Sequence, residues 1–153
     1  MTGDKPNTGC VFCQKAGDAA TPPDPLVVYR GTLAYLVLNK YPYNNGHLLI
    51  VPYRHTPTLA TLTADELQEM ALLTQRTEVA LREAYSPEGI NIGINLGKPA
   101  GAGVVEHVHI HAVPRWNGDT NFMTVFGDTR VLPEDLESTA ARLRPIFERL
   151  GES

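Results

Sequence analysis

The sequence has only two cysteines, no long apolar run and no excess of positive charge, and each shortage excludes a class of protein. No apolar segment approaches the roughly 20 residues of a membrane span. The net charge of −4 gives no general field that would attract nucleic acid or an anionic membrane. We therefore expect no nucleic-acid or membrane partner, and any phosphate must be bound by a local pocket.

The two cysteines are spaced Cys-x-x-Cys, at Cys10 and Cys13. The segment before them lacks a basic start followed by an apolar stretch, so we expect a cytoplasmic protein. In that compartment the spacing favours a metal site or a redox pair over a structural disulfide.

The chain has 153 residues, of which 42% are hydrophobic, and this is the size of one ordinary domain. We expect a single domain over 1–153, with an N-terminal segment over 1–25, a core over 26–115 and a C-terminal loop and helix over 116–153. The proline-rich stretch 14–25 is predicted to be a surface loop.

Short β-prone runs at 26–29 and 33–39 predict a hairpin, and the dense apolar run 47–52 predicts a strand covered on both faces. Alternating isoleucines in 90–96 predict a strand with one buried face. The histidine-rich run near 107–112 predicts a further strand.

Capping-box spacing between Thr63 and Glu66 predicts an amphipathic helix that reaches about Tyr85. Its apolar face is expected to hold Leu67, Met70, Ala71, Thr74, Thr77 and Leu81. A second helix is predicted from Leu132, with a bend at Pro145. The expected fold is therefore α+β, a largely antiparallel sheet of about five strands with one long helix and a C-terminal helix.

Three histidines alternate with apolar residues in the segment 107–113, which reads His-Val-His-Ile-His-Ala-Val. In an extended chain His107, His109 and His111 share one face. The glycine-rich loop 97–103 just upstream suggests backbone N–H groups that face an anion, so the combination points to phosphate. Two alternatives remain: histidines that only fill a polar edge, and chelation of a metal by a pair of them.

This segment matches the signature of the histidine triad family, and the segment 39–52 resembles that family's ribose-binding residue, Gly-His strand and following proline. The resemblance covers roughly residues 10–125 and implies the family's fold. It also implies an enzyme that transfers or hydrolyses nucleotidyl groups.

The resemblance implies that His109 attacks the α-phosphorus of a nucleotide and forms a covalent intermediate, while the carbonyl of His107 fixes its tautomer. It implies that His111 holds the α-phosphate oxygens, that His47 lies beside the triad and that Asn39 binds the ribose.

The loop before the triad departs from the family, because Gly-Ala-Gly-Val stands where many relatives have Gly-Gln-Ser or Gly-Gln-Thr. Backbone amides at Gly101 and Gly103 can still cradle phosphate. The side-chain role in assisting the leaving group is left to Asn95 or Lys98.

Some bacterial members of the family bind zinc through an N-terminal Cys-x-x-Cys, a histidine after the Gly-His strand and the first triad histidine. The resemblance therefore implies a structural zinc held by Cys10, Cys13, His55 and His107. On that interpretation His107 is a ligand and not an acid or base.

The segment 114–123 looks like bacterial proteins of the diadenosine tetraphosphate phosphorylase type. Arg115 is expected at distal phosphates, and Trp116 either at a base or, with Phe122, in packing. The preferred substrate is diadenosine tri- or tetraphosphate, with water or phosphate as acceptor, and a homodimer is implied by the family. Alternatives are a nucleoside phosphoramidase, a nucleotide-binding regulatory module and a metalloenzyme that uses the triad as ligands.

Overall fold

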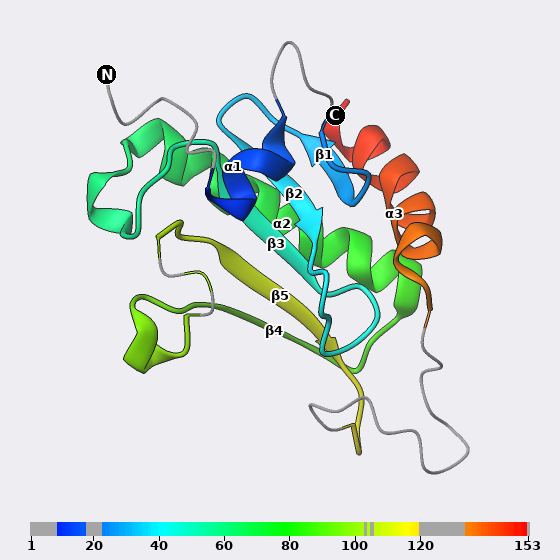
Figure 1. Ribbon diagram of the computed structural model, residues 1–153. Helices are drawn as coiled ribbons and strands as arrows, with labels where there is room; N and C mark the ends of the chain where they lie inside the picture. The colour runs from blue at the N-terminus through cyan, green and yellow to red at the C-terminus, as the bar shows by residue number, and fades with distance from the viewer. Residues whose placement is uncertain (1–8, 18–22, 103, 105, 120–133, 153) are drawn as a thin grey trace.

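The computed structural model describes residues 9–17, 23–102, 104, 106–119 and 134–152, and its centre is one antiparallel sheet (Figure 1). The strand order is β1-β2-β3-β5-β4, and every neighbouring pair is antiparallel. The strands are β1 Val27–Arg30, β2 Ala34–Leu38, β3 Leu48–Pro52, β4 Gly89–Ile94 and β5 Ile110–Arg115. The predicted α+β sheet of about five strands is confirmed.

Two long helices cover one face of this sheet, α2 over Ala64–Tyr85 and α3 over Leu136–Gly151 (Figure 1). The predicted capping box starts α2: Thr63 accepts a bond from the N–H of Glu66, whose side chain accepts the N–H of Thr63. A short helix, α1 over Val11–Ala16, belongs to the other face, and 3₁₀ turns η2 and η3 span Leu59–Thr61 and Lys98–Ala100.

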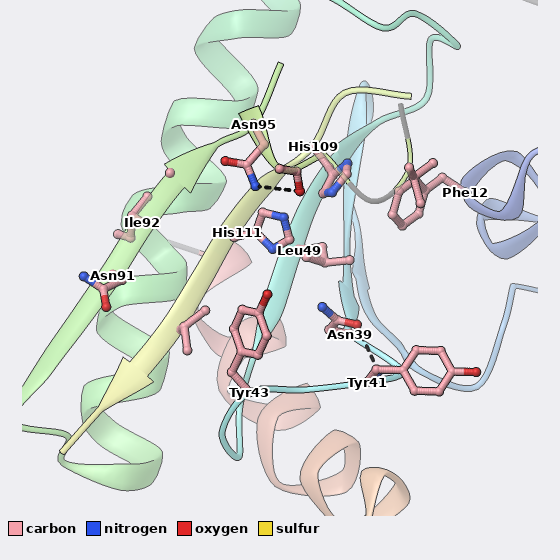
Figure 2. Close-up of a pocket in the computed structure, with 14 residues that line it drawn as sticks. Phe12, Asn39, Tyr41, Tyr43, Leu49, Asn91, Ile92, Asn95, His109 and His111 are labelled. Carbon is pink, nitrogen blue, oxygen red and sulfur yellow. Dashed lines mark hydrogen bonds between the residues drawn. The ribbon is translucent and has the colours of Figure 1, made fainter. Parts of the chain in front are cut away.

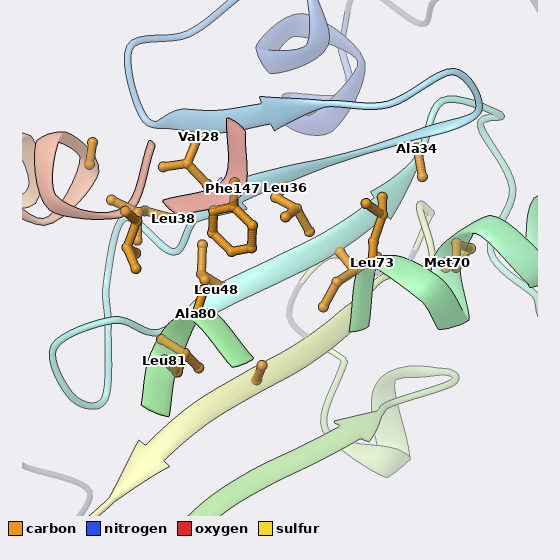
Figure 3. Packing of buried hydrophobic residues seen from close by; sticks show 14 of the residues in the cluster. Val28, Ala34, Leu36, Leu38, Leu48, Met70, Leu73, Ala80, Leu81 and Phe147 are labelled. Carbon is orange, nitrogen blue, oxygen red and sulfur yellow. The ribbon is translucent and has the colours of Figure 1, made fainter. Parts of the chain in front are cut away.

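Two apolar clusters sandwich the central strands, which explains why β2 and β3 are buried along their whole length. The larger cluster packs α2 and α3 against the sheet and includes Leu36, Leu48, Leu81 and Phe147 (Figure 3). The smaller cluster joins α1 to the opposite face and includes Phe12 and Leu49 among its members. The prediction that strand 47–52 is covered on both faces is confirmed. In the described part of the chain, no helix has the length and apolar character of a membrane span.

Several predicted boundaries were wrong. Helix α1 occupies the start of the stretch predicted as loop 14–25, because the N–H of Gln14 bonds to the carbonyl of Cys10 and closes a helical turn. Helix α3 begins at Leu136, where Asp135 caps it, whereas Leu132 lies outside the described residues. Pro145, where a bend was predicted, lies inside α3, and the helix continues beyond it to Gly151.

The exposed faces also differ from the prediction. Met70, Thr77 and Leu81 of α2 are buried as predicted, whereas Leu67 is 41% exposed. The buried face is completed by Glu66, Leu73 and Ala80. In β4, Ile92 is 46% exposed, because this strand forms the edge of the sheet. The spacing of apolar residues predicted the helix and the strand correctly, but it did not predict which of their side chains are buried.

Candidate active site

Strand β5 begins only at Ile110. His107 and His109 therefore precede the strand, whereas the sequence predicted that they lie within it. The ladder with β3 ends at the pair Ile50 and Ile110. Beyond it, the N–H of Val108 bonds to the carbonyl of Thr56 at 2.7 Å, which continues to hold the segment in place.

His109 has one ring nitrogen committed to the backbone. Its Nδ1 lies 2.9 Å from the carbonyl oxygen of His107. A carbonyl only accepts, so we infer that Nδ1 carries the proton and that Nε2 presents a lone pair. The sequence-based expectation that this carbonyl fixes the tautomer agrees with the geometry.

A second chain of hydrogen bonds orients His111. The N–H of Tyr43 donates to Nδ1 of His47 at 3.2 Å, which places the His47 proton on Nε2. That nitrogen lies 3.1 Å from Nδ1 of His111. His111 therefore carries its own proton on Nε2, as a donor for an anion.

Burial keeps this cluster neutral. It lowers the pKa of His111 to about 4, with His109 adding to the effect. Burial also lowers the pKa of His109, although the bond to the His107 carbonyl opposes this. Neutral rings can offer one lone pair and one N–H each, which is what a nucleophile and an oxyanion donor require.

A cavity of about 640 Å³, here called the histidine cavity, opens over His109 and His111 (Figure 2). Phe12, Asn39 and Leu49 line it on one side of the histidines, and residues of β4 line the other. Its size suits a nucleotide. The remaining lining residues are Tyr41, Tyr43, Asn91, Ile92, Gly93, Asn95, Gly101, Val104 and Val113.

The predicted binding residues divide into two groups. Asn39, Asn95 and Gly101 line the histidine cavity, whereas Lys98 and Arg115 do not. The Arg115 guanidinium is bound by Asp119 at 2.6 Å and by Asn91 at 2.9 Å, so it is held at the rim. Its predicted contact with distal phosphates stays a prediction.

Amides of the loop before the triad form hydrogen bonds within the loop itself. The N–H groups of Ala100, Gly101 and Ala102 donate to carbonyls of Gly97 and Lys98. A 3₁₀ turn uses the N–H of Gly101, although Gly101 lines the histidine cavity, and its predicted contact with phosphate stays a prediction. Gly103 lies outside the described residues, as does Phe122.

Cys10, Cys13, His55 and His107 converge on one point, with their ligand atoms within 4.8 Å of one another. Nδ1 of His107 lies 3.4 Å from the Cys10 sulfur and 3.7 Å from that of Cys13, and Nδ1 of His55 lies 3.4 Å from the Cys13 sulfur. In tetrahedral zinc sites the sulfur and nitrogen ligands lie about 3.5 Å apart. The donor set and its spacing therefore fit zinc.

The backbone supports this cluster. Nε2 of His107 lies 2.8 Å from the carbonyl of Pro52, which puts its proton there and turns the Nδ1 lone pair toward the sulfurs. Arg54 bonds to the buried carboxylate of Glu66, which ties the loop before His55 to the start of α2. His107 thus faces the sulfurs, while His109 and His111 face the cavity.

Comparison with known proteins agrees with this geometry. A family model described as the HIT domain matches residues 23–118. The chain belongs to the HIT family. The AP-4-A phosphorylase of Mycobacterium tuberculosis strain H37Rv is 48% identical over 124 residues, which are 81% of this chain and 64% of that protein. This HIT chain thus spans less than two thirds of that relative's length.

Two other HIT relatives show that the likeness extends to sequence and structure. The bis(5'-adenosyl)-triphosphatase of Dictyostelium discoideum is 32% identical and covers 80% of this chain and 85% of its own. The crystal structure of a zinc-bound histidine triad family protein from Mycobacterium smegmatis has a TM-score of 0.72 and 33% identity, and covers 94% of this chain and 96% of its own. The predicted family is confirmed.

Several residues of this HIT site were not predicted from the sequence. Phe12 packs against His109 with ring centroids 4.8 Å apart, and its position between the two cysteines was an unused signal. Tyr43 stacks on His47 at 5.2 Å. Asn91 and Gly93 alternate with the isoleucines of β4, and this alternation was the signal that places them on the opposite face of the strand.

The buried His47 predicts a specific acid sensitivity. Burial, with His111 and His109 nearby, lowers its pKa from 6.5 to about 3. Below pH 6.5 the unfolded chain binds a proton that the folded chain excludes. Its contribution to stability is complete above that pH and is lost as the pH falls toward about 3, by about 1.4 kcal/mol per pH unit.

We therefore expect His47→Gln to have a flatter pH dependence of the free energy of unfolding than the wild type. Urea titrations between about pH 6.5 and pH 4.5 measure it. Parallel slopes for the two proteins would show that His47 does not exclude the proton.

Proposed function

We propose that this HIT protein cleaves dinucleoside polyphosphates, such as diadenosine tri- or tetraphosphate, at the α-phosphate through a nucleotidyl-histidine intermediate on His109. One observation carries the proposal: Nδ1 of His109 is bound to the His107 carbonyl, which leaves Nε2 as a nucleophile in a cavity of nucleotide size. The relatives from Mycobacterium tuberculosis and Dictyostelium discoideum, an AP-4-A phosphorylase and a bis(5'-adenosyl)-triphosphatase, support this substrate class.

In the first step, Nε2 of His109 forms a bond to the α-phosphorus, and the bond from phosphorus to the bridging oxygen breaks. The leaving oxygen takes the electron pair, and the charge on the modified ring is stabilised by the His107 carbonyl. His111 donates its Nε2–H to an α-phosphate oxygen as charge develops there. His47, which donates to His111, keeps that proton in position.

In the second step an acceptor attacks the same phosphorus, and His109 leaves as a neutral ring with its proton still on Nδ1. Water gives a nucleoside monophosphate and releases a proton, whereas inorganic phosphate gives a nucleoside diphosphate. Both acceptors approach one intermediate, so the histidines do not select between them.

Labelled phosphate distinguishes the acceptors. We expect the protein to convert diadenosine tetraphosphate in the presence of ³²P-labelled phosphate, and labelled ADP identifies a phosphorylase. Unlabelled AMP with ATP identifies an asymmetric hydrolase. A phosphoramidase would cleave only adenosine 5′-phosphoramidate, and nucleotide binding without turnover would identify a regulatory module; either result contradicts the proposal.

We also propose that Cys10, Cys13, His55 and His107 hold a structural zinc ion. Two thiolates and two imidazoles form a closed ligand set, which would fix α1 beside the triad. Among the described residues, this is the group whose ligand atoms converge, and it includes neither His109 nor His111. That separation speaks against a metalloenzyme that uses the triad as ligands.

A homodimer that pairs through the exposed edge of β4 is the proposed assembly. Ile92 and Leu96 at this edge are 46% and 45% exposed, and an unpaired strand edge offers a row of backbone partners. Sedimentation velocity of the wild type should give a dimer, and Ile92→Glu should give a monomer. A monomeric wild type would contradict this assembly.

A further inference from the structure

Strand β4 lacks a side chain at the one position that faces His111. Gly93 pairs with His111 and Asn91 with Val113, and directly paired residues of neighbouring strands project from the same face. Gly93 lines the histidine cavity, and a Cβ built on it would meet no atom within 4 Å. The space that a side chain would fill therefore belongs to the cavity.

Neither the backbone nor the packing of the described residues explains this glycine. Its φ is not in the positive region that favours glycine, and β4 pairs with β5 in regular register from Gly89 to Ile94. Glycine inside a strand weakens it and otherwise marks a bulge, a bend or the close approach of a ligand or another backbone. The six consecutive pairs of β4 with β5 are unshifted, which excludes a bulge and speaks against a tight bend at Gly93, so a close approach is left.

The order of the strands assigns a part of the substrate to this space. Phe12, Asn39 and Leu49 lie on one side of the histidines and provide apolar and amide contacts for a nucleoside (Figure 2). The reactive histidines are on the β5 segment, in the middle. A group that leaves the α-phosphorus away from the nucleoside therefore passes over β4, which is next in the sheet.

Two amides flank the space above Gly93. Asn91 in β4 and Asn95 just after its end both line the histidine cavity, two residues before and two residues after Gly93. Nδ2 of Asn95 donates one hydrogen to the carbonyl of Gly101 at 3.5 Å, which leaves its second hydrogen for another acceptor. Arg115 donates to Oδ1 of Asn91 at 2.9 Å, which leaves the hydrogens of Nδ2 for another acceptor. Amide N–H groups are suitable donors to the oxygens of a phosphate chain.

We propose that Gly93 is a specificity-determining residue whose missing side chain makes room for the leaving polyphosphate of a dinucleotide. The inference rests on the proposed function, because it concerns the group that departs when His109 attacks the α-phosphorus. A small leaving group does not need this space. Gly93 therefore selects between substrates that share the same nucleoside and α-phosphate and differ only beyond it.

The test compares two substrates in two variants. Gly93→Val fills the space, and Gly89→Val is the matched control, because Gly89 is on the same strand, has no atom within 4 Å of its Cβ position and does not line the histidine cavity. Diadenosine tetraphosphate has a large leaving group, and adenosine 5′-phosphoramidate has ammonia. On the proposed mechanism both substrates form the same nucleotidyl-His109. The polyphosphate leaves with the electron pair on its oxygen, and the phosphoramidate nitrogen takes up a proton and leaves as ammonia.

We expect Gly93→Val to lower kcat/KM for diadenosine tetraphosphate by roughly 100-fold, as for other misplaced reacting groups, and for the phosphoramidate by less than about threefold. Gly89→Val should change neither. An equal loss on both substrates would overturn the inference, because the side chain would then disturb His111 itself.

Two further outcomes separate the inference from its premises. Full activity of Gly93→Val on diadenosine tetraphosphate would contradict this inference alone. Failure of the wild type to cleave diadenosine tetraphosphate would contradict the proposed function as well. Sedimentation of both variants tests whether another backbone occupies the space. A change of oligomeric state in Gly93→Val, but not in Gly89→Val, would assign it to a second copy and overturn the inference.

Discussion

Replacing His109 with asparagine is expected to reduce turnover of diadenosine tetraphosphate by roughly 10⁴-fold or more, as for other enzymes that lose their nucleophile. Asparagine can keep a hydrogen bond to the His107 carbonyl, but its amide nitrogen has no lone pair for attack on phosphorus. Steady-state release of nucleotide products measures the loss. A rapid-quench experiment with ³²P-labelled substrate should trap a labelled protein for the wild type only.

Two measurements show that this variant remains folded. Its zinc content should equal that of the wild type, because His109 is not among the four converging ligands. Its affinity for AMP should change little, since Phe12, Asn39 and Leu49 are untouched. Retained turnover in His109→Asn, or labelled protein formed by it, would assign the attack to another group.

The local elements that the sequence predicted correctly are those with their own short-range signals. The capping box of Thr63 and Glu66 starts α2, and the dense apolar run 47–52 becomes the doubly covered β3. Helix α1 had no such signal, because its six residues are too few for a helical period. The sequence also could not show that β4 lies at the edge, which depends on the strand order.

The site could be predicted where side-chain identity determines the role and not where backbone groups do. The triad spacing and the four zinc-ligand candidates follow from residue types at matched positions. The N–H of Tyr43, which sets the His47 tautomer, and the carbonyl of Pro52, which orients His107, can come from any residue type. Their partners are therefore decided by the fold, and so is the use of the loop amides within η3.

Replacing Cys10 with serine is expected to lower zinc affinity by more than about 100-fold, since even outer partners of a metal site contribute 10- to 100-fold. Cys10 is fully buried and its sulfur lies 3.4 Å from Nδ1 of His107, so no solvent-exposed group can replace it without rearrangement. Zinc that binds only the folded state at 100 times its Kd stabilises that state by about 2.7 kcal/mol. Thermal unfolding of the wild type should respond to zinc, and that of Cys10→Ser should not.

The same variant tests how the two sites are connected. Cys10 and Cys13 flank Phe12, whose ring packs against His109 and lines the cavity. Loss of zinc should therefore release one wall of the nucleoside side, and we expect KM to rise more than kcat falls. His109→Asn is the reciprocal control, since it should lose turnover and keep zinc.

Retention of one zinc ion per chain by Cys10→Ser would exclude this ligand set. Loss of zinc with an unchanged KM would show instead that α1 keeps its place through core packing and the bond from the Tyr35 hydroxyl to the Phe12 carbonyl.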